Sequence, residues 1–353
     1  MIYDNKKAPY IRNKFTVERS TFSNQIIVGA VSAKVSSSLQ GQNAGLKINE
    51  VIKPAIGEFI ERQSLFYNYK SSKDNMKAFR LITGEEASFP AGDIVFARGA
   101  EFSDSCGVAS HLNSKQAIES AFLEFFERQS YIFNWLTKSS GKLIDLDSFN
   151  NEYIANYSHT LNQFVDKLYL FEISLDPTIK VVFGLGIGIY HKIAGLSAAF
   201  TIEEAIASTL QEMVQGASYK HNKNNVDYYE DNFDYGDDVD YYFENFEKYN
   251  PQQLIAEYAY LFKDNRKFAN VQSTPIRDLN LLIPVIENNL KIKIYCSLIP
   301  CFYKGFRTKI VKVFSPEGYP HMSPINYNDI SDSVIYGKKV SDCPNFNKLV
   351  LFP

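Results

Sequence analysis

The sequence contains few of the residues that build disulfide scaffolds or structural zinc sites. Its 353 residues include four cysteines and five histidines, with no C-x-x-C, H-E-x-x-H or C₂H₂ spacing among them. Four scattered cysteines are too sparse for a disulfide framework, so we expect free thiols. The histidines give no indication of a structural zinc site.

The chain also lacks a large excess of charge and any long apolar run. The formal net charge is -3, so no global field attracts nucleic acid or an anionic membrane. No apolar run is long enough to span a bilayer, and no apolar core follows the N-terminal residues Met1–Lys7. We therefore expect a cytoplasmic protein that binds neither nucleic acid nor membrane.

What the chain does contain is one motif written twice. The sequence E-F-x-E-R-Q-S begins at Glu58 and again at Glu124, inside stretches with helical periodicity. Residues three apart share a helix face, so Glu61 lies beside Glu58 and Glu127 beside Glu124. Neighbouring carboxylates repel each other. A lone copy is usually a solvated ion-pairing surface, but two copies predict a cation between them.

Hydrophobic periodicity and turn residues give a coarse secondary structure. The predicted helices cover residues 48–66, the residues after 114, and residues 201–219. The predicted strands cover residues 26–31, 94–97, 180–190, 291–298 and 308–314. Residues 36–45 read as a loop, and residues 222–249 as an exposed loop or insertion. Helices interleaved with strands predict an α/β (α+β) fold, and we expect a single domain over 1–353.

Local signals refine three of these elements. Pro54 predicts that the first helix becomes regular only from that residue onward. Asn113 and Thr201 stand where N-caps are expected, each followed three residues later by Gln or Glu. Alternating glycines at 184, 186 and 188 leave one face of a strand without side chains. This pattern is explained more simply by close packing within the sheet than by a phosphate-binding site.

The repeat extends beyond the motif, because Ala55 and Ala121 match at the same offset. This predicts duplicated helix-on-sheet units whose helices pair across a pseudo-twofold axis. Glu212 on the third predicted helix adds a fifth carboxylate. Five carboxylates bury badly unless cations neutralise them, and two Mg²⁺ ions with a triphosphate would do so.

Three ordered segments together resemble the YcaO superfamily. The first is Ala55–Arg62, and the second runs from Asp104 to Arg128. The third is Glu203–Glu212 with Gln215. The resemblance spans most of the chain, and the combination is more specific than any one motif. Further segments of the chain are similar to the azoline-forming cyclodehydratase subunits of bacteriocin synthetases. These segments are Glu127–Ser130 with Trp135-Leu136, Lys312–Pro316 with His321-Met322, and the Phe352-Pro353 ending.

The resemblance implies a fold with pseudo-twofold repeated units around a nucleotide site and an ATP-dependent enzyme that acts on peptide amides. A Cys, Ser or Thr side chain attacks the preceding carbonyl, the γ-phosphoryl group of ATP activates the oxygen, and loss of phosphate leaves a thiazoline or oxazoline. Such enzymes serve the biosynthesis of ribosomally made peptide antibiotics (bacteriocins). Formation of thioamide or amidine groups, or a non-catalytic nucleotide-binding scaffold, are the alternatives.

The resemblance also implies partners and site residues. The partners are a precursor peptide, an E1-like (ThiF-like) subunit that docks the leader peptide, and an FMN-dependent dehydrogenase, in a hetero-oligomeric synthetase complex. The implied Mg²⁺ ligands are Glu58, Glu61, Glu124, Glu127 and Glu212. The implied ATP-binding residues are Ser105, Gly107, Arg62, Arg128, Gln211, Gln215, Arg19 and Ser23. The implied catalytic groups are the Pro353 carboxylate and His111, although a loop hydrogen bond is the plainer reading of His111.

Overall fold

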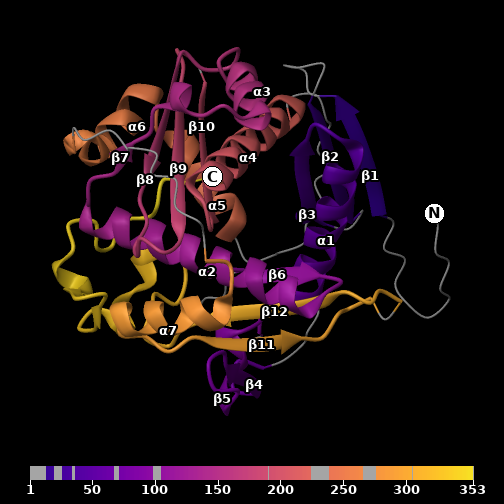
Figure 1. The fold of residues 1–353 in the computed structure, drawn as a ribbon, viewed down its shortest axis with the longest axis vertical. Coiled ribbons are helices and arrows are strands. Elements are labelled where there is room, and N and C mark those ends of the chain that lie inside the picture. The colour runs from indigo at the N-terminus through magenta and orange to yellow at the C-terminus, as the bar shows by residue number, and fades with distance from the viewer. Residues whose placement is uncertain are drawn as a thin grey trace.

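The computed structural model describes residues 13–19, 26–33, 36–66, 71–97, 105–189, 191–223, 238–264, 276–303 and 305–352. Its strands form three main antiparallel sheets and a small hairpin (Figure 1). The N-terminal sheet has the order β1-β2-β3, with β1 at Asn13–Arg19, β2 at Ile27–Ala33 and β3 at Ser36–Gly45.

A central sheet has the order β5-β4-β11-β12-β6. Its strands are β4 (Asn75–Arg80), β5 (Glu86–Pro90), β6 (Val108–His111), β11 (Tyr295–Ile299) and β12 (Lys309–Phe314). The third sheet has the order β10-β9-β8-β7, with β7 at Lys142–Leu143, β8 at Lys167–Glu172, β9 at Lys180–Ile187 and β10 at Lys192–Ala199. The hairpin consists of β13 (Val334–Ile335) and β14 (Lys338–Lys339).

Helices separate the sheets. The long ones are α1 (Ile48–Phe66), α2 (Ser114–Thr137) and α4 (Ile202–Lys223), and the shorter ones are α3 (Glu152–Leu161), α5 (Asp238–Lys248), α6 (Pro251–Glu257) and α7 (Leu279–Leu290). In the described part of the chain, no helix is both long enough and apolar enough to cross a bilayer. The mixture of helices and antiparallel sheets confirms the predicted α/β (α+β) class.

The two copies of the motif lie on opposite faces of the central sheet. Val108 and Ile310 share a core with Phe59 of α1, whereas Val311 and Ala109 of the same strands share another core with α2. Strand alternation explains this division, because successive side chains point to opposite faces. Helices α1 and α2 therefore belong to different cores, with strands β6 and β12 of the central sheet between them.

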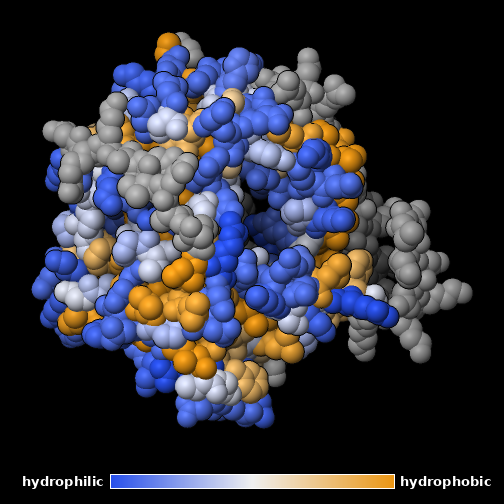
Figure 2. Space-filling view, in the orientation of Figure 1, coloured by the Kyte–Doolittle hydropathy of each residue, from blue (hydrophilic) through white to orange (hydrophobic). Residues whose placement is uncertain are grey.

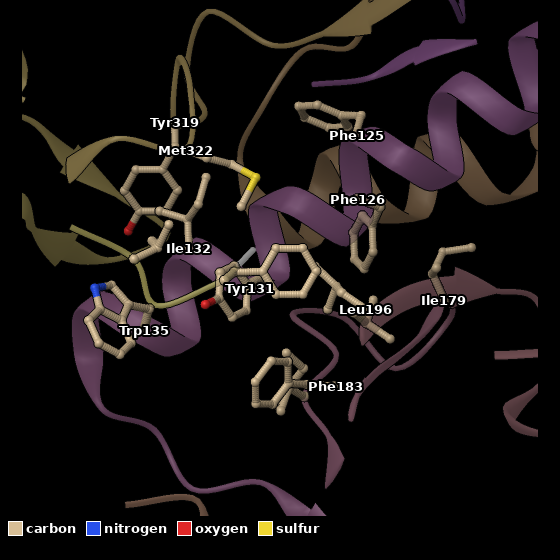
Figure 3. Close-up of a cluster of buried hydrophobic side chains, with 14 of the residues drawn as sticks. Phe125, Phe126, Tyr131, Ile132, Trp135, Ile179, Phe183, Leu196, Tyr319 and Met322 are labelled. Carbon is tan, nitrogen blue, oxygen red and sulfur yellow. The ribbon is translucent and has the colours of Figure 1, made fainter. Parts of the chain in front are cut away.

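The core around α2 is aromatic and joins the central sheet to the third sheet. Figure 3 shows Phe126 on the side of α2 that faces Leu196, while Phe125 points away from it. Trp135 and Tyr131 are buried further along the helix. The high aromatic content of the sequence is thus concentrated where one helix must fill the space between two sheets.

Residues 36–45 form strand β3 rather than the predicted loop. They pair with β2, and a Cβ atom at Gly41 would lie 2.0 Å from the Ala55 carbonyl oxygen of α1. The small residues that resemble a loop in the sequence are therefore what allows the α1 backbone to approach a strand.

Three other local predictions were wrong. Residues 94–97 form no strand, because Ile94 and Val95 follow a short 3₁₀ turn at Ala91–Asp93. Helix α1 begins at Ile48 and includes Pro54 in its interior. Part of the expected loop 222–249 is helix α5, whose Phe246 is buried and whose Glu247 carbonyl accepts a 3.0 Å hydrogen bond from Lys192.

The predicted caps are present. The Asn113 side chain accepts hydrogen bonds from the N–H groups of Lys115 and Gln116, and the Glu204 N–H donates to the Thr201 hydroxyl. The strand predicted over 180–190 is present as β9 but ends at Ile187, and its glycines serve packing. A Cβ atom at Gly184 would lie 2.5 Å from the sulfur of Met213 on α4.

Candidate functional site

Three helices and three sheet edges alternate around one region of the molecule. Contacts run from α1 to β6, from β6 to α2, from α2 to β10, from β10 to α4, from α4 to β3 and from β3 back to α1. Strands β3, β6 and β10 are each the last strand of their sheet. Each of the three helices contributes acidic side chains to this region, and each edge strand places polar groups near those side chains.

Glu58 is held between its own helix and strand β3. Its Oε2 accepts a hydrogen bond of 2.6 Å from the Gln42 N–H, and its Oε1 lies 2.6 Å from the Arg62 guanidinium. Arg62 follows one helical turn later, so the ion pair is the ordinary i,i+4 arrangement. Both oxygens of Glu58 are therefore oriented by identified donors.

Glu61 lies where α1 passes the edge strand β6. Burial raises the pKa of Glu61 well above its ordinary value, and the negative charges of Glu124 and Glu58 raise it further. The positive charge of Arg62 and the nearby Ser110 hydroxyl, which itself donates a 2.9 Å hydrogen bond to the Gly57 carbonyl, lower the pKa and partly oppose this effect. The two copies of the repeat thus approach each other through Glu61 and Glu124, although a sheet separates their helices.

Glu127 is the most deeply buried of the set, with 9% of its surface exposed. Its Oε2 accepts a 3.1 Å hydrogen bond from the Ala198 N–H of β10, and its Oε1 lies 3.3 Å from Nε of Arg128. Burial raises the pKa of Glu127 well above its ordinary value, Arg128 lowers it, and the charges of Glu212 and Glu124 raise it.

Glu212 on α4 completes the set. Its Oε2 accepts a 2.6 Å hydrogen bond from the Leu196 N–H, two residues from Ala198 on the same strand. Burial raises the pKa of Glu212, while Arg128 and the Leu196 N–H lower it and the charge of Glu58 raises it. The carboxylate on the third predicted helix therefore belongs with the two copies of the repeat.

The electrostatic interactions close into a circle. The charges of Glu58 and Glu124 raise the pKa of Glu61. The charges of Glu124 and Glu212 raise the pKa of Glu127, and the charge of Glu58 raises the pKa of Glu212. Arg128 responds to the same field, because the charges of Glu127 and Glu124 raise its pKa against the opposing effect of burial. We call these five glutamates, with Arg62 and Arg128, the carboxylate ring.

The carboxylate ring occupies a hydrophilic part of the molecule. Figure 2 shows a hollow lined by hydrophilic residues near the middle of the visible face, between the positions that α4 with β10 and α1 with β3 occupy in Figure 1. Crowded carboxylates with raised pKa values are expected where a bound cation compensates them. The donors are carboxylate oxygens, which are among the oxygen ligands that Mg²⁺ takes.

The carboxylates do not form a tight cage in the part of the chain that the structure describes, since no three acidic, histidine or cysteine side chains there converge around a point that could hold an ion. Backbone N–H groups and arginines hold them in place instead. Mg²⁺ commonly binds one or two carboxylates together with phosphate oxygens and water. The open arrangement fits an ion that arrives with a polyphosphate better than an ion in an all-protein cage.

Two other predicted nucleotide contacts have packing roles in the structure. Gly107 has a φ of +71°, and a Cβ atom there would lie 2.1 Å from the Val313 carbonyl oxygen. Gln211 donates a 2.8 Å hydrogen bond to the Asn43 side chain and another to the Ala44 carbonyl of β3. Ser105 lies half-buried in the turn before β6, and Gln215 is half-buried on α4.

His111 is exposed at the end of β6. Its Nδ1 accepts a 3.0 Å hydrogen bond from the Asn113 N–H, at the start of α2. This bond matches the plainer reading of His111 as a loop hydrogen-bonder.

The remaining predicted residues lie at the limits of the described chain. Ser23 and Pro353 are outside the described residues, and Arg19 ends strand β1 with its side chain outside them. The preceding residue, Phe352, is buried, and its ring lies 5.6 Å from the Arg128 guanidinium. The described part of the C-terminal segment therefore reaches the carboxylate ring at Arg128.

Sequence reasoning missed several groups that contact the carboxylates. They are the Ser110 hydroxyl and the backbone N–H groups of Gln42, Leu196 and Ala198. Backbone donors carry no side-chain signature, and only knowledge of which strands are sheet edges could have located them. Ser110, next to His111, was within the second motif and could have been found.

A separate pocket of about 420 Å³ lies at the start of α4. Asn151, Tyr153 and Glu203 line it, and none of the predicted site residues does. It lies at the N-terminal end of α4, whereas Glu212 lies in the middle of that helix, and no residue of the carboxylate ring lines it.

The family model described as YcaO cyclodehydratase, ATP- and Mg²⁺-binding, matches residues 66–288. No curated protein matches the chain by sequence. A chain of the E. coli microcin synthetase McbBCD complex with pro-MccB17 bound has a TM-score of 0.79 and 19% identity over 100% of both chains. YcaO from Methanopyrus kandleri bound with AMPPCP and Mg²⁺ has a TM-score of 0.67 and 16% identity, over 87% of this chain and 86% of that chain.

A heterocyclase in complex with substrate and cofactor has a TM-score of 0.67 and 15% identity, over 88% of this chain and 50% of that chain. At these identities the structural likeness shows a common fold. The family match covers α2 and α4, which carry Glu124, Glu127 and Glu212, whereas almost all of α1 precedes it.

Proposed function

The chain belongs to the YcaO family, and from this premise we propose that it is an ATP-dependent cyclodehydratase. Its substrate would be a ribosomally made precursor peptide, in which Cys, Ser or Thr residues become thiazoline or oxazoline rings. The observation that carries the proposal is the carboxylate ring, because the family is described as binding ATP and Mg²⁺ and the ring supplies ligands suited to both.

The chemistry of the reaction explains why such a ring is useful. An amide oxygen is a poor leaving group, and transfer of the γ-phosphoryl group of ATP to it makes it a good one. Phosphoryl transfer requires positioning and charge neutralisation more than covalent participation by the protein. Mg²⁺, when bound, would neutralise the phosphate charge, and Glu58, Glu61, Glu124, Glu127 and Glu212 would hold it.

The two arginines complete the proposed assignment. Arg128 is largely buried between Glu127 and the Phe352 ring, so its guanidinium has a fixed position at the ring. Arg62 is more exposed and pairs with Glu58. We assign Arg128 to the orientation of the carboxylates and Arg62 to contact with phosphate, because an exposed guanidinium can change partner at lower cost.

The proposal includes a multi-subunit setting. One of the matching structures is a chain of a synthetase complex, and another is a heterocyclase bound to substrate. These two likenesses support a synthetase complex that acts on a peptide substrate. We propose that in this complex an E1-like subunit docks the leader peptide and an FMN-dependent dehydrogenase oxidises azolines to azoles. We also assign the chain to bacteriocin biosynthesis in the cytoplasm.

The test is incubation of a Cys/Ser/Thr-rich precursor peptide with the protein, ATP, Mg²⁺ and its partner subunits, followed by mass spectrometry. We expect loss of one water mass for each ring formed, and no loss with Glu127→Gln. A mass change that corresponds to exchange of oxygen for sulfur would support thioamide formation instead. ATP hydrolysis at background level in the wild type and in Glu127→Gln alike would favour a nucleotide-binding scaffold.

A further inference from the structure

Three carboxylates of the ring accept hydrogen bonds from the backbone of sheet edges that pair with no further strand in the described part of the chain. Gln42 lies on β3, and Leu196 and Ala198 lie on β10. Their N–H groups donate to Glu58, Glu212 and Glu127 over 2.6, 2.6 and 3.1 Å respectively. Each strand is the last in its sheet, so these N–H groups have no neighbouring strand to bind.

The spacing on β10 follows from strand geometry. In an antiparallel pair, the N–H groups of alternate residues point toward the partner strand and those between them point away. Leu196 and Ala198 are two residues apart, so both point away from β9 and toward the helices. Ala199, paired with Lys180, has the other orientation and points toward β9.

Each of these bonds fixes one oxygen of a carboxylate and so restricts the other, which in Glu58 lies 2.6 Å from Arg62 and in Glu127 lies 3.3 Å from Arg128. Each carboxylate oxygen has a second lone pair that a cation can use. Glu127 and Glu212 repel each other, and without such bonds each would turn away from the crowded region. A hydrogen bond to a charged acceptor is about twice as strong as one between neutral groups. A backbone donor is also more rigid than a side chain, because the whole sheet holds it.

We propose that the free edges of β3 and β10 are positioning elements of the ion site, with the N–H groups of Gln42, Leu196 and Ala198 orienting Glu58, Glu212 and Glu127 toward a divalent cation. The inference rests on the proposed function in one respect, namely that the carboxylate ring binds such a cation. It adds that two sheet edges, and not the helices alone, determine the affinity.

Two adjacent alanines provide a matched experiment. Replacing Ala198 by lactic acid exchanges its N–H for an ester oxygen and removes the donor to Glu127 without changing any side chain. The same replacement of Ala199 removes an N–H that faces β9. Both proteins are compared with the wild type by calorimetric titration with Mn²⁺ complexed to a non-hydrolysable ATP analogue, because the open site fits an ion that arrives with a polyphosphate, and by thermal unfolding.

We expect the Ala198 ester to bind Mn²⁺ about tenfold more weakly, as is typical when a second-shell hydrogen bond to a metal ligand is lost. The Ala199 ester should lose stability but keep its Mn²⁺ affinity within about twofold of wild type, because its missing bond belongs to the sheet ladder. Replacing Leu196 by its hydroxy-acid analogue should weaken binding as the Ala198 ester does.

Glu127→Gln distinguishes failure of this inference from failure of the proposed function. If Glu127→Gln abolishes Mn²⁺ binding while the Ala198 and Leu196 esters bind as tightly as wild type, the edges do not position the ligands and the inference is overturned. Equal affinity in the wild type, Glu127→Gln and the esters would show that the ring is not the ion site, and both proposals would fall.

Discussion

The glutamines of the repeated motif, Gln63 and Gln129, should respond in opposite directions to the same substitution. Both are buried, with 0% and 2% of their surface exposed. The Gln129 amide donates to the Tyr319 carbonyl over 2.9 Å and accepts from the Tyr319 N–H over 2.7 Å, and the Tyr336 hydroxyl donates to it as well. Within the described residues, neither amide atom of Gln63 has a hydrogen-bond partner.

The expected magnitudes follow from these contacts. Gln129→Leu leaves a buried N–H and a buried carbonyl of Tyr319 unpaired, and at about 1–3 kcal/mol for each group the unfolding free energy should fall by about 3 kcal/mol. Gln63→Leu removes two unpaired polar atoms from an apolar core and should raise it by about 1 kcal/mol. With about 2.1 cal/mol/K of unfolding entropy per residue, these changes correspond to Tm shifts of about −4 °C and +1 °C.

The assay is thermal unfolding of the two variants followed by circular dichroism, with the serines that follow each glutamine as controls. Ser64 and Ser130 make equivalent bonds, accepting from Phe302 N–H over 2.9 Å and from Leu175 N–H over 3.2 Å. Ser64→Ala and Ser130→Ala should therefore cost similar amounts. If Gln63→Leu destabilises the protein as much as Gln129→Leu, the two copies are equivalent and the reasoning fails.

Two further predictions concern the ring and its surroundings. Without metal, Glu127→Gln should be about 1 kcal/mol more stable than wild type at a pH above the raised pKa of Glu127, because the folded state there must carry a crowded, buried charge. That difference in unfolding free energy should shrink as the pH falls toward the ordinary carboxyl pKa of 4.5, because the wild-type folded state then takes up a proton that the unfolded state does not. Unfolding curves at several pH values measure it, and a difference that stays constant with pH would contradict a raised pKa for Glu127. Gly107→Ala should lower the unfolding free energy by more than about 2 kcal/mol, because a left-handed backbone and a contact of 2.1 Å with the Val313 oxygen both oppose a side chain, and wild-type stability in urea unfolding would contradict this account.

The acidic residues of the site could be read from the sequence because they follow helical periodicity. In each copy of the motif the two glutamates are three residues apart, on a helix with a clear apolar stripe. The helix that bears Glu212 has an N-cap at Thr201. Local spacing therefore determines which carboxylates share a face. It does not determine which helices meet.

The parts that could not be read depend on long-range pairing. Residues 36–45 form β3 only because β2 lies beside them and α1 packs against Gly41. The central sheet joins β4 and β6 to β11 and β12, which are about two hundred residues later in the chain, so its position between α1 and α2 leaves no local trace. The backbone donors of β3 and β10 follow from that arrangement, and single-chain patterns do not reveal them.

The central claim is that the carboxylate ring holds the divalent ions that accompany ATP. Anomalous diffraction from crystals soaked with Mn²⁺ and a non-hydrolysable ATP analogue tests it most directly. The account predicts Mn²⁺ peaks bound by carboxylates of Glu58, Glu61, Glu124, Glu127 and Glu212, with the triphosphate beside them. Strong peaks elsewhere, such as in the pocket beside Asn151, with none at the ring, would contradict it.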